Sequence, residues 1–150
     1  MRALIQRVKQ ASVTIEHEVV GEISQGLLIL LGVEESDGQE DIDWLVRKIV
    51  QLRIFNDADD QMNLSLKDID GQALVVSQFT LHAQVKKGNR PSFIKAAKPD
   101  ISKPLYLQFV KSIQQELSNP IQTGEFGAHM DVALINDGPV TIWMDSKNKE

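Results

Sequence analysis

Gly26-Leu-Leu-Ile-Leu-Leu-Gly-Val33 is the longest apolar stretch of this 150-residue chain. At eight residues it is too short to span a bilayer, which takes about 20 residues. A strand that is apolar on both of its faces is typical of a position buried on both faces. We therefore expect this run to form a central strand of a sheet.

Strands are also predicted on the N-terminal side of this run. Residues 2–8 are largely apolar and suit a core strand. Residues 12–16 alternate between polar and apolar side chains, as a half-buried strand does. A short turn leads into residues 19–23, so the two segments around it form a predicted hairpin.

Two helices are predicted further along the chain. The first covers residues 38–52, where apolar side chains recur at helical spacing, at Ile42, Leu45, Val46, Ile49 and Val50. The second is predicted to begin at a Ser102 cap with Pro104 in its first turn, where the missing N–H of proline is tolerated. Asn119-Pro120 is expected to end it.

The remaining segments read as strands and loops. Residues 72–80 form a second strongly apolar strand, and residues 81–99 form a long loop. An acidic turn is predicted over residues 56–61, and strands over residues 130–136 and 140–144.

This order of elements predicts a single α+β domain, with a largely antiparallel, barrel-like sheet that carries two helices. The domain is predicted to cover residues 1–145. Residues 146–150 form a polar C-terminal tail that we expect to be frayed or loosely docked.

The composition excludes several kinds of site. The chain has no cysteine, which removes thiol nucleophiles, disulfides and zinc–thiolate sites. Its three histidines, His17, His82 and His129, lack carboxylate partners at metal-ligand spacing. No glycine-rich phosphate-binding or dinucleotide-binding motif is present. We therefore predict no metal and no cofactor.

The apolar runs are too short for a signal peptide or a membrane span, so we expect a cytoplasmic protein. The net charge of −5 argues against a general nucleic-acid binder, whose surface is usually basic. Basic side chains nevertheless gather in the loop after the 72–80 strand, at Lys86, Lys87, Arg90, Lys95 and Lys98. From the sequence, this segment is either an ordinary solvated loop or a local site for a phosphate backbone.

Ser77-Gln-Phe-Thr80 ends an apolar strand where it enters the long loop. Polar groups at a strand end are held rigidly, which suits catalysis. Thr80 could act as a nucleophile if a base were near, and His82, Lys86 and Lys87 are the candidates close in sequence. The same residues could equally cap the strand end.

Asn136-Asp-Gly-Pro-Val-Thr141 interrupts the last β segment. Asp-Gly favours a turn and proline removes a ladder donor, so a plain turn accounts for the pattern. A cis Gly138–Pro139 bond is the other possibility, and it would build a rigid polar wall without side chains.

These motifs occur together with Arg90-Pro-Ser-Phe93 and Thr123-Gly-Glu-Phe-Gly-Ala128, and the chain opens with Met1-Arg-Ala-Leu-Ile-Gln-Arg-Val8. In this combination and order the chain resembles the D-aminoacyl-tRNA deacylase family, first described as D-tyrosyl-tRNA deacylase. The resemblance covers residues 1 to about 144.

The resemblance implies a homodimer that hydrolyses the ester between a D-amino acid, or mischarged glycine, and the 3′-terminal adenosine of tRNA. The active sites would lie at the subunit interface. Ser77 to Thr80 would form one wall of the pocket, and Gly138–Pro139, cis in the family, would enter from the partner subunit. Main-chain carbonyls there would hold the amino group of the substrate and exclude L side chains.

The resemblance leaves two mechanisms open. In the first, backbone N–H groups around Phe79 and Thr80 stabilise the oxyanion, and the 2′-hydroxyl of the RNA assists. In the second, Thr80 is the nucleophile and Gln78 orients the carbonyl. The five basic residues of the long loop would contact acceptor-stem phosphates, with no role for DNA.

Two readings of a different class compete with an esterase. A non-catalytic tRNA- or origin-DNA-binding module would need exposed stacking aromatics and a broad basic face, whereas aromatic residues make up 5% of this chain. A purely structural dimer would need only the apolar strands. Neither accounts for the two loop motifs occurring together.

Overall fold

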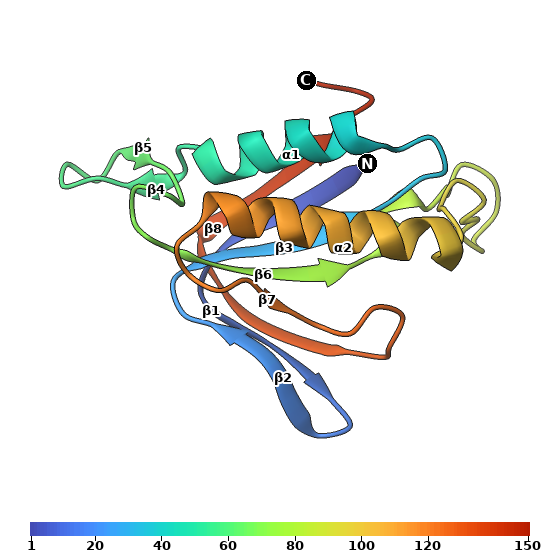
Figure 1. Ribbon diagram of the computed structural model, residues 1–150, viewed down its shortest axis with the longest axis horizontal. Coiled ribbons are helices and arrows are strands. Elements are labelled where there is room, and N and C mark those ends of the chain that lie inside the picture. Colours follow the sequence, from blue (N-terminus) through green and yellow to red (C-terminus); the bar gives the residue numbers. More distant parts are fainter.

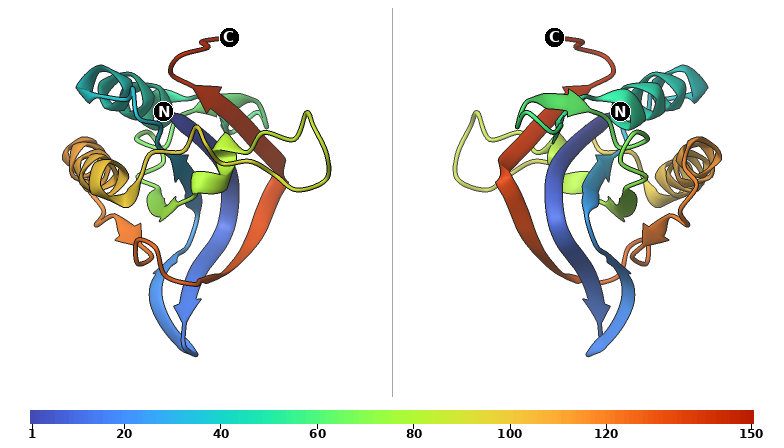
Figure 2. Two further views of the ribbon diagram at one scale, coloured as in Figure 1. Left: turned by 90° about the vertical axis from the view of Figure 1, so that its right-hand side faces the viewer. Right: turned by 90° about the vertical axis from the view of Figure 1, so that its left-hand side faces the viewer.

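The computed structural model describes all residues from Met1 to Glu150, and the apolar run is its strand β3 (Gly26–Gly32). This strand lies between β1 (Arg2–Ile15) and β6 (Gln72–Ser77) in a six-stranded sheet that curves into a nearly closed barrel (Figures 1 and 2). All β3 residues except Leu30 are buried, which confirms the central position expected from the sequence.

Strand β1 organises the antiparallel part of the sheet. The two strands predicted over residues 2–8 and 12–16 form this one continuous strand of 14 residues. Its N-terminal half pairs with β3 and its C-terminal half with β2 (Glu18–Ile23). Along its other edge runs β8 (Asp131–Asp145), which joins the two strands predicted at the C-terminal end.

The other part of the sheet is parallel. Strand β6 pairs parallel with β3 on one side and with β7 (Gln122–Thr123) on the other. Each pair is linked by a long connection that contains a helix, the usual way to join parallel strands. The sheet is therefore mixed within the expected single α+β domain. The predicted acidic turn is the connection of a small hairpin, β4 (Phe55–Asn56) and β5 (Met62–Leu64).

Helices α1 (Gln39–Gln51) and α2 (Pro99–Glu116) contact each other and cover one face of the sheet (Figure 1). The apolar stripe predicted for the first helix is its buried face. The start predicted for the second helix is wrong. Pro99 begins the helix, because the fixed φ of proline suits a first helical position, and Ser102 lies one turn inside with its hydroxyl donating to the Lys98 carbonyl at 3.0 Å.

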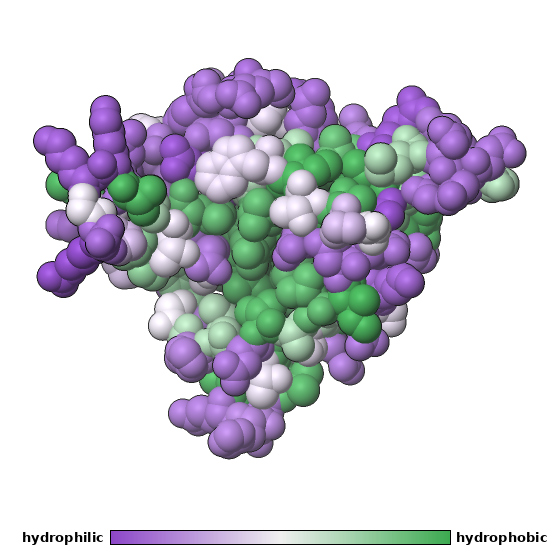
Figure 3. Space-filling view, turned by 180° about the vertical axis from the view of Figure 1, so that it is seen from behind, coloured by the Kyte–Doolittle hydropathy of each residue, from purple (hydrophilic) through white to green (hydrophobic).

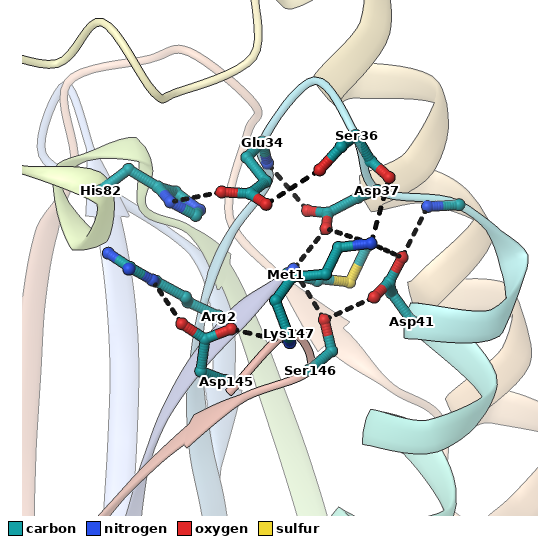
Figure 4. A network of polar contacts seen from close by, with 11 residues as sticks. Met1, Arg2, Glu34, Ser36, Asp37, Asp41, His82, Asp145, Ser146 and Lys147 are labelled. Atoms are coloured by element: carbon teal, nitrogen blue, oxygen red, sulfur yellow. Dashed lines mark hydrogen bonds and ion pairs between the residues drawn. The ribbon is translucent and has the colours of Figure 1, made fainter. Parts of the chain in front are cut away.

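The C-terminal tail docks at its first residue. Ser146 is buried, its N–H donates to the Met1 carbonyl at 2.9 Å, and its hydroxyl donates to Asp41 at 2.6 Å. The Met1 amino group donates to Asp37 and to Ser146 Oγ (Figure 4). Lys147 adds hydrogen bonds from its ammonium group to the Ser36 carbonyl at 3.1 Å and to Asp41 at 3.0 Å. The polar sequence of the tail did not predict these contacts, because they depend on partners far away in the chain.

Asp41 is the most strongly perturbed carboxylate of this network. Burial alone raises its pKa, but hydrogen bonds from Ser146, the Gly38 N–H and Lys147 outweigh that effect and lower the pKa from 3.8 to about 2. No helix in the structure combines the length and the apolar character that crossing a membrane requires.

Candidate active site

The Ser77–Thr80 motif lies where strand β6 leaves the sheet. The Gln78 N–H extends the β6 ladder by one bond to the Leu31 carbonyl at 2.7 Å, and the chain then turns into the short 3-10 helix η1 (Phe79–His82). The first N–H groups of a helix have no acceptor within it. The turn therefore presents the main-chain N–H groups of Phe79 and Thr80 as free donors.

A cavity of about 550 Å³ opens beside this turn. Its walls come from β3, the end of β6, the start of α2 and the loop after β7, and most of its lining side chains are apolar. Of the Ser77–Thr80 motif, Ser77, Gln78 and Phe79 line it. A mostly apolar pocket with a few polar groups at one end is the usual form of a small-molecule site.

Thr80 lies outside this lining. Its side chain is exposed, and its hydroxyl accepts a hydrogen bond from the Gln78 side-chain amide, a group that cannot take a proton. His82, considered as a base from the sequence, is fully buried and forms no hydrogen bond with Thr80. The arrangement gives the threonine no base.

Two aromatic pairs form the cavity walls. The Tyr106 and Phe126 rings lie 5.6 Å apart, and the Phe79 and Phe93 rings meet edge to face at 5.0 Å with an interplanar angle of 74°. The Tyr106 hydroxyl donates to the Val75 carbonyl at 2.8 Å, and burial raises the pKa of Tyr106 to about 12. Tyr106 is therefore a neutral structural donor at physiological pH.

Arg2 binds the far end of η1, and His82, the last residue of η1, is fully buried; Figure 4 shows both side chains. An Arg2 guanidinium nitrogen donates to the Leu81 carbonyl at 3.0 Å, and Arg2 Nε pairs with Asp145 at 2.9 Å. Burial lowers the pKa of His82, although its Nδ1 lies 3.8 Å from a Glu34 carboxylate oxygen. His82 is thus a neutral packing residue.

The predicted basic residues all lie on the surface. Lys86, Lys87, Arg90 and Lys95 are exposed in a loop that projects from the body beside η1 (Figure 2), and Lys98 is exposed at the N-cap of α2. Two main-chain hydrogen bonds between Gln84 and Ser92 fold the loop back on itself.

Gly138–Pro139 is cis, as the resemblance implied, and lies in a bulge in the middle of β8. The bulge stands opposite Arg7, whose Nε donates to the Asp137 carbonyl at 3.0 Å. Arg7 also donates to the Ile54 carbonyl at 2.5 Å and to Asn56 at 3.1 Å. Only 7% of Arg7 is exposed. Our sequence reasoning missed this support for the bulge, since Arg7 lies in a strand far from the motif.

Within one chain the bulge does not meet the Ser77–Thr80 wall. Ser77 is in register with Leu31, then Ala3 and then Met144 of β8, so three strand spacings separate it from that strand. The bulge lies a further four residues along, opposite Arg7. Standard strand dimensions then separate the two motifs by roughly 20 Å along the sheet.

Comparison with known proteins identifies this architecture. Residues 4–145 match the family described as D-Tyr-tRNA(Tyr) deacylase, and this range contains both motifs. The chain belongs to this family. It is 62% identical to the D-aminoacyl-tRNA deacylase of Flavobacterium johnsoniae over the full length of both chains, and 63% identical to that of Flavobacterium psychrophilum, again over both full lengths.

Solved structures agree with the deacylase family fold. A protein titled c-Myc DNA Unwinding Element Binding Protein superposes with a TM-score of 0.92 at 39% identity, covering 97% of this chain and 98% of its own. A probable eukaryotic D-amino acid tRNA deacylase superposes with a TM-score of 0.78 at 16% identity, covering 95% and 97%. The second likeness concerns the fold alone.

Proposed function

We propose that this chain hydrolyses the ester bond between a D-amino acid and the 3′-terminal adenosine of tRNA, and that it rejects L-aminoacyl-tRNA. The observation that carries this proposal is full-length similarity of about 60% identity to proteins named D-aminoacyl-tRNA deacylase. The pocket beside η1 and its free main-chain donors supply a place for the chemistry.

The main chain is proposed to carry catalysis. A water molecule attacks the ester carbonyl, and the carbonyl oxygen becomes an oxyanion that the N–H groups of Phe79 and Thr80 stabilise. Donors fixed in this way commonly contribute about 10²–10³ in rate. Collapse of the intermediate breaks the ester C–O bond, and the ribose oxygen leaves with a proton. The Thr80 hydroxyl is bonded to the Gln78 amide and has no base, so Thr80 is not the nucleophile in this proposal. The neighbouring 2′-hydroxyl of the RNA assists the reaction instead.

A homodimer is proposed to complete the site. Strands β2 and β8 carry apolar side chains with about half of their surface exposed. These are Val19 and Val20 in β2, and Ile135 and Trp143 in β8. Figure 3 shows apolar residues gathered in a band across the face opposite the helices. A partner packed there would bring its Gly138–Pro139 to the pocket of the first chain, where main-chain carbonyls would hold the substrate amino group and leave room for a D side chain or for glycine.

The basic loop is proposed to contact the acceptor stem in the cytoplasm. Replacing Lys86, Lys87 and Arg90 with alanine should raise KM for tRNA and flatten the dependence of KM on salt, because each lost phosphate contact reduces counterion release. An unchanged KM and salt slope would leave the loop as a solvated surface without a role in binding.

The decisive experiment measures release of labelled tyrosine from D-tyrosyl-tRNA and L-tyrosyl-tRNA by the wild type and by Thr80→Ala. Release of D-tyrosine and not of L-tyrosine supports the proposal. Full activity of Thr80→Ala supports main-chain catalysis, whereas loss of activity with a folded protein revives the threonine nucleophile. Glycyl-tRNA in the same assay measures how fast the achiral substrate is hydrolysed.

DNA binding is the alternative that one of the similar structures raises by its title. The net charge of −5 disfavours it here. If the wild type released neither D- nor L-tyrosine and instead retained duplex DNA in a mobility-shift assay, a binding module would replace the esterase.

A further inference from the structure

Phe93, from the Arg90-Pro-Ser-Phe93 segment, has no part in the mechanism above. Its ring nevertheless meets the ring of Phe79 edge to face, at 5.0 Å between centroids. Phe79 is the residue whose main-chain N–H opens η1, and 57% of Phe79 is exposed. Phe93 therefore packs directly against the side chain of the residue that is proposed to donate to the oxyanion.

Main-chain contacts fix the place of Phe93 at the base of the loop. Ser92 exchanges two hydrogen bonds with Gln84, at 2.8 and 3.0 Å. The Phe93 carbonyl accepts from Ala96 at 2.9 Å, and Ala97 donates to the carbonyl of Val33 on the cavity wall, also at 2.9 Å. Phe93 thus lies between two fixed segments of main chain. On one side is the Gln84–Ser92 hairpin with its lysines, and on the other is the segment that Ala97 ties to Val33.

The two ends of η1 are held differently. At the far end, the Arg2 guanidinium binds the Leu81 carbonyl and the His82 side chain is fully buried. At the near end, the Phe79 side chain stands in the open with Phe93 against it. Since a short 3-10 turn has weak internal hydrogen bonds, its orientation depends on such side-chain contacts.

We propose that Phe93 is a positioning residue of the deacylase, acting through Phe79 to hold the main-chain donors of η1 in line with the substrate carbonyl. This inference rests on the proposed function. Because Phe93 follows directly on the Gln84–Ser92 hairpin that carries Lys86, Lys87 and Arg90, seating of the acceptor stem on that hairpin would also press the aromatic pair into place. The loop then serves both binding and the chemical step.

The test separates the two roles by using a substrate without a tRNA body. The probes are D-tyrosyl-tRNA and the D-tyrosyl ester of adenosine, and the variants are Phe93→Leu and Phe93→Tyr. Loss of one edge-to-face pair should lower kcat of Phe93→Leu about three- to tenfold on both substrates, with KM for the adenosine ester unchanged. Phe93→Tyr keeps the ring and should restore kcat.

Two controls keep the result specific. Ile94→Ala changes an apolar neighbour in the same loop that is 82% exposed, and it should leave kcat on the adenosine ester at the wild-type value. The double variant Phe79→Leu/Phe93→Leu should lose no more activity than Phe79→Leu alone, because both single changes remove the same contact. Thermal unfolding of each variant identifies any protein that has lost its fold.

The opposite results overturn the inference. If Phe93→Leu keeps wild-type kcat on the adenosine ester, or alters only KM for tRNA, Phe93 belongs to binding and not to positioning. Additive losses in the double variant would likewise show that the ring pair carries no coupling. A wild type that releases no D-tyrosine from either substrate would instead refute the proposed function, so the two failures are distinguishable.

Discussion

Replacing Arg7 with methionine should both destabilise the fold and disable the Gly138–Pro139 bulge. Arg7 is 7% exposed and lies in the middle of β1. Its guanidinium holds the Asp137 carbonyl at 3.0 Å, the Ile54 carbonyl at 2.5 Å and the Asn56 side chain at 3.1 Å. Methionine keeps much of the aliphatic volume and removes every donor. The bulge therefore loses the hydrogen bond from Arg7 to the Asp137 carbonyl.

The magnitude follows from the acceptors left behind. Hydrogen bonds from a charged donor contribute about 1.5–3 kcal/mol each, and a buried carbonyl without a donor costs about 1–3 kcal/mol. The Asp137 carboxylate, 3.4 Å from Arg7 Nε and 29% exposed, also loses its ion-pair partner. With allowance for coupling between neighbouring bonds, the free energy of unfolding should fall by about 3–5 kcal/mol.

Urea unfolding measures the stability, and release of D-tyrosine from tRNA measures the function. Arg7→Lys keeps the charge but not the fork of donors, so it should be intermediate in both assays. The matched control is Arg53→Met, because Arg53 bonds a carbonyl and an amide of Asn63 on the exposed hairpin, away from the bulge. An Arg7→Met protein within about 0.5 kcal/mol of the wild type, and fully active, would refute the reasoning.

Three further changes probe other contacts. Gly138→Ala places a Cβ 2.9 Å from an Arg7 nitrogen at a φ of +129°, so D-tyrosine release should fall at least tenfold, and near-normal release would contradict the close packing. The folded pKa of Asp41, about 2, lies below its unfolded 3.8, so its stabilisation is present above pH 3.8 and is lost as the pH falls through 2; Asp41→Asn should lower the unfolding free energy at pH 7 by about 2 kcal/mol and remove that acid dependence in urea titrations. Burial lowers the pKa of His82 below 6.5, so the free energy of unfolding should decline as the pH falls below 6.5. His82→Leu should flatten that decline in urea titrations, and an unchanged decline would show that His82 does not cause it.

The sequence predicts the elements whose own side chains determine them. An eight-residue apolar run becomes the buried strand β3, and the apolar stripe of the first helix predicts α1 to within one residue at each end. The start of α2 is less predictable, since both Pro99 and Ser102 are acceptable at a helix beginning and local sequence does not choose between them. Parallel pairing of β3 with β6 depends on the path of α1, which no strand pattern encodes.

The candidate site divides in the same way. Ser77–Thr80 and Gly138–Pro139 are visible in the sequence because a strand end and a glycine–proline step have local signatures. Arg7 and Arg2 have none, since each acts on a carbonyl that lies 130 or 79 positions away. The basic residues were visible individually, but the projecting hairpin that carries Lys86, Lys87 and Arg90 depends on the hydrogen bonds between Gln84 and Ser92.

The separation of the two motifs is itself an argument about assembly. Both are attached to one hydrogen-bonded sheet, through β6 and through β8, with β1 and β3 between them. The two motifs lie roughly 20 Å apart along this sheet, which has no hinge that could bring Gly138 to Ser77, because such a movement would break several ladders at once. If both motifs act on one substrate, a second copy must therefore supply one of them. A single-chain form of the proposed dimer with Gly138→Ala in one half and Ser77→Trp in the other should then keep one intact site, whereas both changes in the same half should leave none. If each pocket were formed within one chain, these two outcomes would be reversed.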